Sequence, residues 1–280
     1  MPAYTLMILI GCAVSFAVAL ARSPKKGLRA DDTLFFIAFL VLGALIGAKI
    51  LYLLIDIPVI YANHDFYFAS AANAATLITS GFVFYGGLIG GFFGGVCYAK
   101  FFHVNTVAIA DNFVPSIPLF HSFGRIGCFL AGCCYGIPYT GRFAVTYTEA
   151  LSDANGISRF PVQLVEAAVN LILFFLLLAL GKKLKKPLQS FGLYLILYGA
   201  ARFILEFFRG DELRGFLGPL STSQWISLIL LPFGLYLFLC KSENNVIAQN
   251  LFNGKLPGSK ESGSRYEGSK INGFSPEDNK

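Results

Sequence analysis

The stretch His121–Arg142 holds most of the side chains in this sequence that could carry out chemistry. It reads HSFGRIGCFLAGCCYGIPYTGR and follows directly on an apolar run. An arginine at the edge of the hydrocarbon is costly unless an anion meets it, so Arg125 is a functional residue by default. The anion that a membrane offers is the phosphate of a phospholipid. The stretch therefore predicts a phosphate site, and its glycines would let the backbone approach a ligand closely.

A second polar pattern lies in the apolar segment GLYLILYGAARFILEFFRGDE. Its polar residues recur at intervals of four, four and three, which places them on one face of a helix (Tyr198, Arg202, Glu206 and Arg209). One interpretation is an internal salt bridge between Arg202 and Glu206. Such a pair alone would not need a second arginine and a tyrosine, and a polar stripe that faces a bundle interior usually lines a substrate path.

Two further segments carry single polar residues beside apolar runs. In RFPVQLVEA, Gln163 and Glu166 lie one helical turn apart. Glu166 either favours the positive end of the helix dipole or orients an arginine, and both interpretations stay open. In FVFYGGLIGGFFGG the small residues favour close helix packing. Tyr85, immediately before Gly86 and Gly87, is a polar ring that could reach a lipid head group.

Three cysteines, Cys128, Cys133 and Cys134, fall inside the first stretch. They could pack as small polarisable residues in a tight glycine-rich turn. They could also form a disulfide or a thiolate site on the oxidising face of the membrane. Three thiols without a fourth ligand argue only weakly for a metal, so we predict no metal and no cofactor. The other cysteines lie in apolar runs and are expected to pack as small hydrophobes (Cys12, Cys97 and Cys240).

The composition is that of an integral membrane protein. Of the 280 residues, 55% are hydrophobic and only 14% are charged, whereas a soluble chain carries roughly a quarter charged residues. The net charge of +6 does not indicate a nucleic-acid partner. The basic residues sit in short clusters between apolar runs and in the tail, where membrane topology accounts for them.

Seven apolar stretches reach or approach the roughly 20 residues that a helix needs to cross the hydrocarbon. They predict an all-α bundle of seven transmembrane helices. The fourth stretch is the weakest, because Asp111, Pro115 and Pro118 interrupt it, and proline kinks or breaks a helix. The stretches are Tyr4–Ala21, Leu34–Ile55, Gly81–Phe102, about Thr106–Phe123, Pro161–Gly181, Ser190–Phe208 and Ser223–Cys240.

The charges between the stretches predict the orientation. Basic residues follow the first, third, fifth and seventh stretches, while the loop Asp56–Ser80 has no Lys or Arg. By the positive-inside rule the N-terminus is outside and the C-terminus is cytoplasmic. Beyond Lys241 the sequence is polar with little to bury. We therefore expect a transmembrane domain over residues 1–240 and a disordered cytoplasmic tail over residues 241–280.

Four of these segments together resemble one known family. YGGLIGG, GRIGCFLAGCCYG, PVQLVEA and YGAARFILEFFR look like the signature regions of the prolipoprotein diacylglyceryl transferases. They occur in that family's order, on helices placed as in its seven-span bundle, and the resemblance covers most of Gly47–Leu239. Glycine-rich helices alone would not be specific for this family. The resemblance is specific because of the GRIG motif and the spacing from Tyr198 to Arg209.

The resemblance implies an enzyme of the bacterial cytoplasmic membrane, which moves diacylglyceryl from phosphatidylglycerol to the lipobox cysteine of a prolipoprotein signal peptide. A thioether forms and glycerol phosphate leaves. The thiol must lose its proton, and cations must stabilise the phosphate. By the resemblance, Arg125 and Arg202 clamp the phosphate, since guanidinium groups bind it through paired hydrogen bonds. Further positions expected to bind phosphatidylglycerol are Tyr198, Glu166, Glu206, Arg209, Gln163, Gly86 and Gly87.

The sequence departs from the family's pattern at several positions. A histidine commonly precedes the Gly-Gly pair where this chain has Tyr85. The family commonly has Arg where this chain has Lys49. In the stretch after GRIG it commonly has Asn, Asn and Glu where this chain has Cys128, Ala131 and Cys133. The usual proton acceptor is therefore missing. His121 or Tyr85 could handle the proton as a catalytic residue, or the chemistry has changed and the cysteines take part directly.

Two rival functions stay open at this point. One is a related membrane enzyme that uses the thiols of Cys128, Cys133 and Cys134 on another acceptor. The other is a phospholipid-binding or transporting membrane protein without chemistry, which would bind phosphatidylglycerol and release no glycerol phosphate. The sequence predicts neither which precursors are modified nor the oligomeric state.

Overall fold

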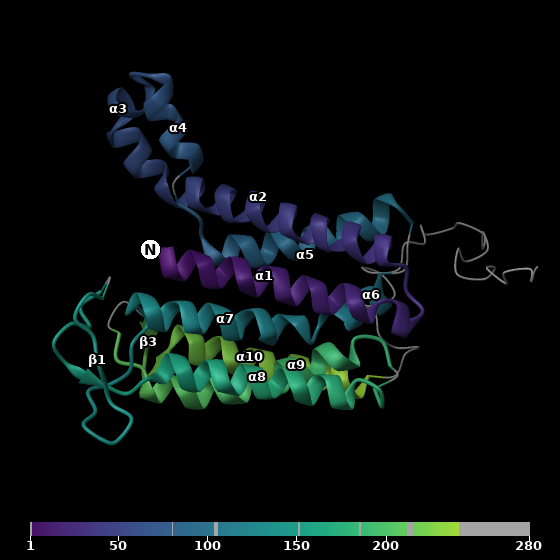
Figure 1. The fold of residues 1–280 in the computed structure, drawn as a ribbon. Coiled ribbons are helices and arrows are strands. Elements are labelled where there is room, and N and C mark those ends of the chain that lie inside the picture. Colours follow the sequence, from purple (N-terminus) through teal and green to yellow (C-terminus); the bar gives the residue numbers. More distant parts are fainter. Residues whose placement is uncertain are drawn as a thin grey trace, which may run out of the picture.

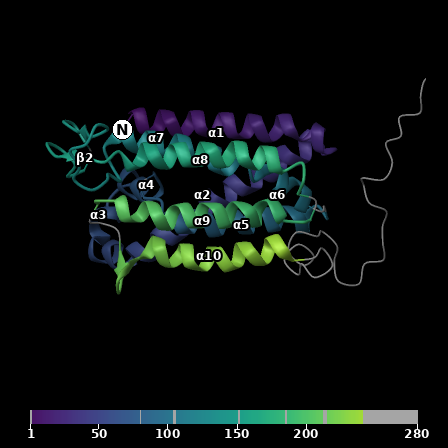
Figure 2. The same cartoon turned by 90° about the horizontal axis from the view of Figure 1, so that it is seen from below.

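The computed structural model describes residues 2–79, 81–103, 106–150, 152–184, 186–211 and 215–240. The tail predicted for residues 241–280 lies outside this range. Within it, long helices lie side by side in one bundle (Figures 1 and 2). The long helices are α1 (Pro2–Arg22), α2 (Ala30–Ala62), α5 (Phe84–Phe101), α7 (Ser116–Ala131), α8 (Val162–Leu180), α9 (Gln189–Leu205) and α10 (Thr222–Leu239).

Five of the described helices are long and apolar enough to cross a membrane. Four of them are α1, α2, α8 and α10. The fifth is formed by α9 together with the 3-10 turn that follows it, η2 (Glu206–Phe208). The chain is therefore an all-α, multi-pass membrane protein. The two remaining predicted spans correspond to α5, which is 18 residues long and rich in glycine, and to α7, which has only 16 residues. The count of seven spans stays a prediction.

The fourth predicted span is divided, as its prolines indicated. The short helix α6 (Val107–Phe113) ends before Pro115, and α7 begins at Ser116. The predicted end of this span at Phe123 is wrong, because α7 continues to Ala131. Glycine is frequent in transmembrane helices, so the glycines that follow Phe123 do not end the helix. Arg125 therefore lies within α7 and not after it.

The second predicted span also extends further than expected. Predicted as Leu34–Ile55, α2 covers 33 residues, or about 50 Å. Beyond it, α3 (His64–Phe68) and α4 (Ala71–Thr79) project from the bundle (Figure 1). The segment predicted as the loop Asp56–Ser80 is thus mostly helical. Its alanine-rich part, AANAATLIT, has the strong helix propensity that a charge-based prediction does not consider.

The helices pack in pairs, most extensively α2 with α5, α9 with α10, α1 with α7, and α7 with α8. In the first pair, Gly43 and Gly47 on α2 meet Gly86 and Gly90 on α5. A Cβ atom added at Gly90 would collide with the carbonyl oxygen of Gly43. Small residues allow this close approach in lipid, which confirms the packing role expected for most of these glycines.

The two ends of the bundle differ. At one end, near the N-terminus, lie two small antiparallel sheets (Figure 1). They pair β1 (Val145–Thr146) with β2 (Ser158–Arg159), and β3 (Phe216–Leu217) with β4 (Leu220–Ser221). At the other end, the basic 3-10 turn η1 (Pro24–Lys26) meets the end of α8, where Lys26 Nζ donates to the carbonyl of Gly181 at 3.2 Å.

Candidate active site

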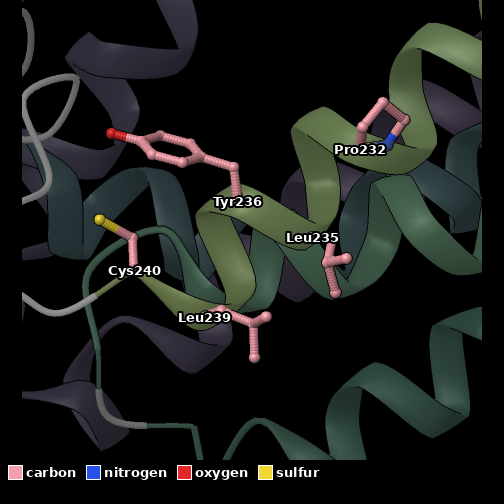
Figure 3. A pocket seen from close by; sticks show the side chains of 5 residues that line it. All are labelled: Pro232, Leu235, Tyr236, Leu239 and Cys240. Atoms are coloured by element: carbon pink, nitrogen blue, oxygen red, sulfur yellow. The ribbon is translucent and has the colours of Figure 1, made fainter.

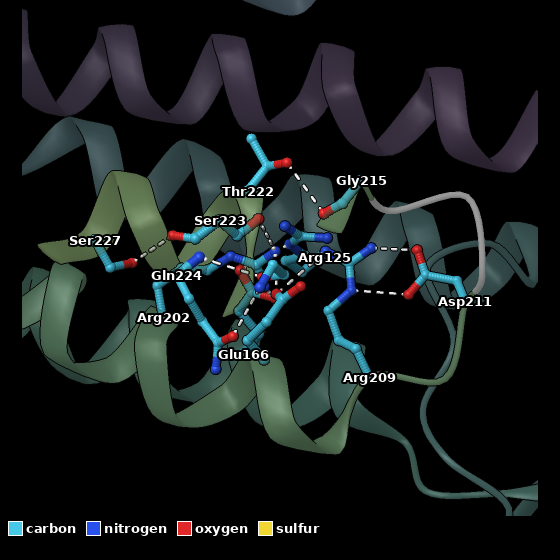
Figure 4. Close-up of polar contacts among 12 residues, drawn as sticks. Arg125, Glu166, Arg202, Arg209, Asp211, Gly215, Thr222, Ser223, Gln224 and Ser227 are labelled. Atoms are coloured by element: carbon cyan, nitrogen blue, oxygen red, sulfur yellow. Dashed lines mark hydrogen bonds and ion pairs between the residues drawn. The ribbon is translucent and has the colours of Figure 1, made fainter. Parts of the chain in front are cut away.

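Glu166 lies at the centre of a buried group of charges that joins three helices. The helix that carries it, α8, begins just after Pro161, whose fixed φ suits a helix start. The Oε1 atom of Glu166 lies 3.0 Å from Nε of Arg125 on α7. Its Oε2 atom lies 3.4 Å from Nη1 of Arg202 on α9. Only 2% of Glu166 is exposed, so one buried carboxylate holds two arginines (Figure 4).

Arg202 has further partners on α9 and α10. Its Nη2 atom lies 2.8 Å from Oε2 of Glu206, which is the ion pair expected from their spacing, and it donates to Oγ of Ser223 at 3.1 Å. The start of α10 is fixed by a capping box, in which Ser221 Oγ accepts from the backbone of Gln224. This box places Ser223 in the first turn of α10, next to the guanidinium.

Arg125 meets His121 one turn earlier on the same helix. Its Nε donates to Nε2 of His121 at 3.2 Å. An accepting Nε2 places the proton of a neutral imidazole on Nδ1. Nε2 of His121 also lies 3.6 Å from Oε1 of Glu166. Among the described residues, Nη1 and Nη2 of Arg125 make no hydrogen bond or ion pair, so these donors can serve an anion.

Arg209 extends the charged group toward the loops. Its Nε donates to Asp211 at 2.8 Å, and its Nη2 also pairs with that carboxylate. Nη1 lies 3.9 Å from Glu206. The backbone around it is tied to the loop after α7, since the amide of Gly210 donates to the carbonyl of Tyr135 at 2.9 Å.

The remaining predicted residues on these helices lie close by. The ring of Tyr198 lies 5.3 Å from that of His121, centroid to centroid, so the predicted stripe does share one face. Gln163 is buried and donates to the carbonyl of Cys133 at 2.9 Å and to the hydroxyl of Tyr147 at 3.2 Å. It therefore supports the cysteine turn, and its contact with lipid stays a prediction.

Tyr85, Gly86 and Gly87 belong to a different helix pair. The charged group is built from α7, α8, α9 with η2, and α10, whereas these residues occupy the first turn of α5. There Gly86 and Gly87 face α2, while 48% of Tyr85 is exposed. Their predicted roles in catalysis and lipid binding stay predictions.

The cysteines of the first stretch cluster beside the charged group. All three are free thiols, so the disulfide that the sequence left open as one alternative is not formed in this structure. Hydrogen bonds with the Cys128 and Cys133 thiols, and then the charges of Arg125 and Arg209, lower the pKa of the Cys134 thiol against the opposite effect of burial. Cys134 lies in the loop after α7.

An apolar depression lies elsewhere, at the far end of α10 from Ser223. It encloses about 460 Å³ and is lined by Pro232, Leu235, Tyr236, Leu239 and Cys240 (Figure 3). None of the described residues that line it is charged, and phosphate recognition needs cationic groups. An apolar lining of this kind on a membrane helix is suited to lipid chains.

Two contact residues were missed by the sequence reasoning. Asp211 follows Arg209 by two positions, so its charge could have been recognised from the sequence. Ser223 reaches Arg202 from a different helix, and nothing in the local sequence signals that contact. Both lie in the described part of the chain and complete the partners of the two arginines.

The sequence model of the prolipoprotein diacylglyceryl transferase family matches residues 1–240. A phosphatidylglycerol–prolipoprotein diacylglyceryl transferase from Clostridium tetani is 36% identical, over 84% of this chain and 91% of the relative. A second, from Clostridium perfringens, is 34% identical over 84% and 89%. A third, from Streptococcus mutans, is 28% identical over 87% and 92%. The chain therefore belongs to the prolipoprotein diacylglyceryl transferase family.

Proposed function

We propose that this chain transfers the diacylglyceryl group of phosphatidylglycerol to the lipobox cysteine thiol of prolipoproteins. A thioether forms and glycerol phosphate is released. The names of the relatives state this activity, and their similarity to this chain covers most of its length. The observation that carries the proposal is the carboxylate of Glu166, which holds Arg125 and Arg202 from two other helices in one buried place.

In this proposal Arg125 and Arg202 bind the phosphate. Buried ion pairs contribute little net stability, so a group of this size is better explained by a ligand that it serves. The two Nη atoms of Arg125 make no hydrogen bond or ion pair among the described residues. They can donate two parallel hydrogen bonds to phosphate oxygens, and these bonds strengthen as the leaving group gains charge.

The other charged residues position the two arginines. Glu166 and Glu206 orient Arg202 from two sides, and Arg209 contributes further positive charge next to Glu206. Tyr198 packs against His121 and limits the orientations of that ring. These residues act through the guanidinium groups, and we expect their loss to weaken lipid binding and turnover together.

The proton of the acceptor thiol has two candidate carriers. Nε2 of His121 already accepts from Arg125. If it took up a proton, it would lose that bond and pair with Oε1 of Glu166, 3.6 Å away. Tyr85 lies on α5 and would need to act from the α2–α5 side. His121→Ala and Tyr85→Phe separate the two, because the residue that takes the proton is the one whose loss shifts the pH profile of turnover.

We also propose the membrane arrangement that the family implies. Seven helices span the bacterial cytoplasmic membrane, with the N-terminus outside and the C-terminus in the cytoplasm. The basic residues of η1 and those after α8 lie at one end of the bundle, which supports this orientation. Residues 1–240 would form the transferase domain, with residues 241–280 as a cytoplasmic tail.

The test uses purified protein in detergent, phosphatidylglycerol and a synthetic lipobox peptide. We expect the peptide to gain the mass of a diacylglyceryl group while an equal amount of glycerol phosphate is released. A peptide with serine in place of the lipobox cysteine is the control and should gain no mass. Binding of phosphatidylglycerol with neither product, from well-folded protein, would instead favour the lipid-binding alternative.

A further inference from the structure

The end of α7 brings three cysteine side chains together. The Sγ atoms of Cys128, Cys133 and Cys134 all lie within 4.8 Å of one another, and each residue is half-buried. From the sequence we predicted no metal, because three thiols lacked a fourth ligand. The convergence of the three sulfur atoms depends on the turn that follows α7, and it assembles a set of ligands that their spacing in the sequence does not reveal.

The turn folds the chain back over the last turn of the helix. Gly132 ends α7 in the left-handed conformation, with φ of 68°. Its amide donates to the carbonyl of Phe129, and the amide of Cys133 donates to the carbonyl of Cys128, both at 3.1 Å. This is the Schellman pattern, and it places Cys133 directly over Cys128. Cys134 follows with φ of 54°, which is uncommon for a residue with a Cβ atom.

Contacts from three other segments hold this turn in place. Gln163 on α8 donates to the carbonyl of Cys133 at 2.9 Å, and Ser152 donates to the carbonyl of Gly132 at 2.5 Å. Further along, Gly136 pairs with Arg209 in an isolated β-bridge. The three thiols therefore sit on a fixed support and do not depend on a ligand to come together.

Three convergent thiolates are the donor set that a thiophilic cation such as Zn²⁺ prefers. Zinc–sulfur bonds of about 2.3 Å in a tetrahedron separate the sulfur atoms by roughly 3.8 Å. The three sulfur atoms lie within 4.8 Å of one another, so each pair is at most about 1 Å further apart than in such a tetrahedron. Among the described residues, no fourth His, Cys, Asp or Glu joins the cluster. Three protein ligands with an open fourth position are typical of catalytic zinc sites, whereas structural sites use four.

The cluster lies next to the phosphate-binding arginines. Cys128 follows Arg125 by three residues, so both lie on the same face of α7. The loop after Cys134 is bonded to the backbone around Arg209, since the amide of Ile137 donates to the carbonyl of Phe208 at 3.0 Å. A thiol bound at the cluster would therefore be near a phosphoester bound at Arg125.

We propose that Cys128, Cys133 and Cys134 bind one Zn²⁺ as three thiolates, and that the open fourth position takes the thiol of the acceptor cysteine. The second part rests on the proposed function. On coordination the acceptor thiol loses its proton, which His121 or Tyr85 takes up as proposed above. Its sulfur then attacks the glyceryl carbon, so that a C–S bond forms and the C–O bond to phosphate breaks. The electron pair of that bond leaves with glycerol phosphate, and nothing is oxidised or reduced.

The metal site is tested on the full chain, purified in detergent under reducing conditions and then equilibrated with Zn²⁺. Elemental analysis after gel filtration should find about one zinc per chain. Single replacements of Cys128, Cys133 or Cys134 by Ser should each lower the Zn²⁺ affinity by at least the roughly 100-fold that loss of an outer partner costs at other zinc sites. Cys12→Ser and Cys97→Ser are matched controls in α1 and α5 and should retain the metal.

A measurement on the unaltered protein keeps the test decisive if the variants misfold. Bound Zn²⁺ should protect three thiols from alkylation, and a chelator should expose them. Equal alkylation with and without Zn²⁺ would overturn the site. So would a disulfide among these cysteines, trapped by acid quenching of membranes and found by mass spectrometry.

The acceptor position is tested with Co²⁺ in place of Zn²⁺. The tetrahedral Co²⁺ spectrum, with its sulfur-to-metal charge-transfer absorption, should change when the lipobox peptide is added and stay unchanged with its serine analogue. An unchanged spectrum with both peptides overturns the acceptor role. Lipidation by metal-free protein would overturn the zinc mechanism and leave the transferase function standing. Zinc binding without lipidation would overturn the transferase function and leave only the metal site standing.

Discussion

At the scale of single residues, the candidate site depends on the carboxylate of Glu166, which pairs with two arginines at once. Each oxygen of Glu166 faces a different guanidinium, and Arg202 is also held by Glu206 and Ser223. Such an arrangement fixes the direction of N–H donors as well as their charge. The planar shape of guanidinium is therefore as important as its positive charge.

Arg202→Lys tests this requirement for shape. A lysine keeps the charge but replaces the planar fork by a point charge, so it cannot satisfy Glu166, Glu206 and a phosphate together. We expect turnover to fall by on the order of 100-fold or more, as for loss of a donor that stabilises developing charge. Lipidation kinetics in detergent measure it. The control is Arg142→Lys at an exposed position, and lipidation by Arg202→Lys at the control's rate would remove Arg202 from the mechanism.

Glu166→Gln tests whether the carboxylate neutralises the arginines. The amide keeps the shape but leaves Arg125 and part of Arg202 without a counter-charge in a buried place. Breaking a buried pair in this way costs about 3–5 kcal/mol, so thermal unfolding in detergent should occur at a clearly lower temperature. Glu149→Gln, on an exposed loop, should unfold like the unaltered protein. An unchanged unfolding temperature for Glu166→Gln would show that the charges are not coupled.

Much of this group could be predicted from residue types and spacing, and some of it could not. The stripe from Tyr198 to Arg209 follows from helical periodicity, and its ion pair between Arg202 and Glu206 is present. Glu166 had two open interpretations, because its partners lie on two other helices that no local pattern can bring together. Ser223 was missed for the same reason. The convergence of the cysteines depends on the Gly132 turn, whose direction the spacing alone does not give.

At the scale of elements, the glycines of α2 and α5 determine how closely two helices approach. The interface allows backbone contact at some positions and leaves ordinary contact distances at others. The sequence indicated dense packing from these glycines but not which ones are in contact. The ends of α2 and α7 were also misplaced, since hydropathy finds the apolar part of a helix and not its last turn.

A comparison of two variants at neighbouring residues, Gly90→Ala and Gly91→Ala, tests this interface. A Cβ atom at Gly90 would overlap the carbonyl of Gly43, whereas at Gly91 its nearest neighbour is 3.4 Å away. Overpacking costs about 1–3 kcal/mol, so Gly90→Ala should unfold at a lower temperature. Gly91→Ala should be neutral or slightly stabilised, because alanine has the better helix propensity. Equal unfolding temperatures for the two variants would contradict the register of α2 against α5.

At the scale of the whole molecule, the two ends of the bundle are chemically different. Arg209 and the loop after the cysteines are bonded to each other and to β2, at the end that carries the two small sheets. At the other end, η1 and the segment after α8 place exposed lysines. Lysines between short spans remain on the cytoplasmic side during insertion. The candidate site would then open at the outer face, where the lipobox cysteine of a translocated precursor arrives.

Small tags at the two ends of the chain test this orientation and the number of spans together. The eleventh strand of a split fluorescent protein, placed before Pro2 or after Cys240, becomes fluorescent only if it meets the remaining strands in the cytoplasm. We expect fluorescence from the tag after Cys240 and none from the tag before Pro2, because an odd number of spans puts the ends on opposite sides. Fluorescence from both tags would require an even number of spans and would exclude seven.

The same chain ended at Cys240 should retain full lipidation activity, since the family match and the described helices both end there.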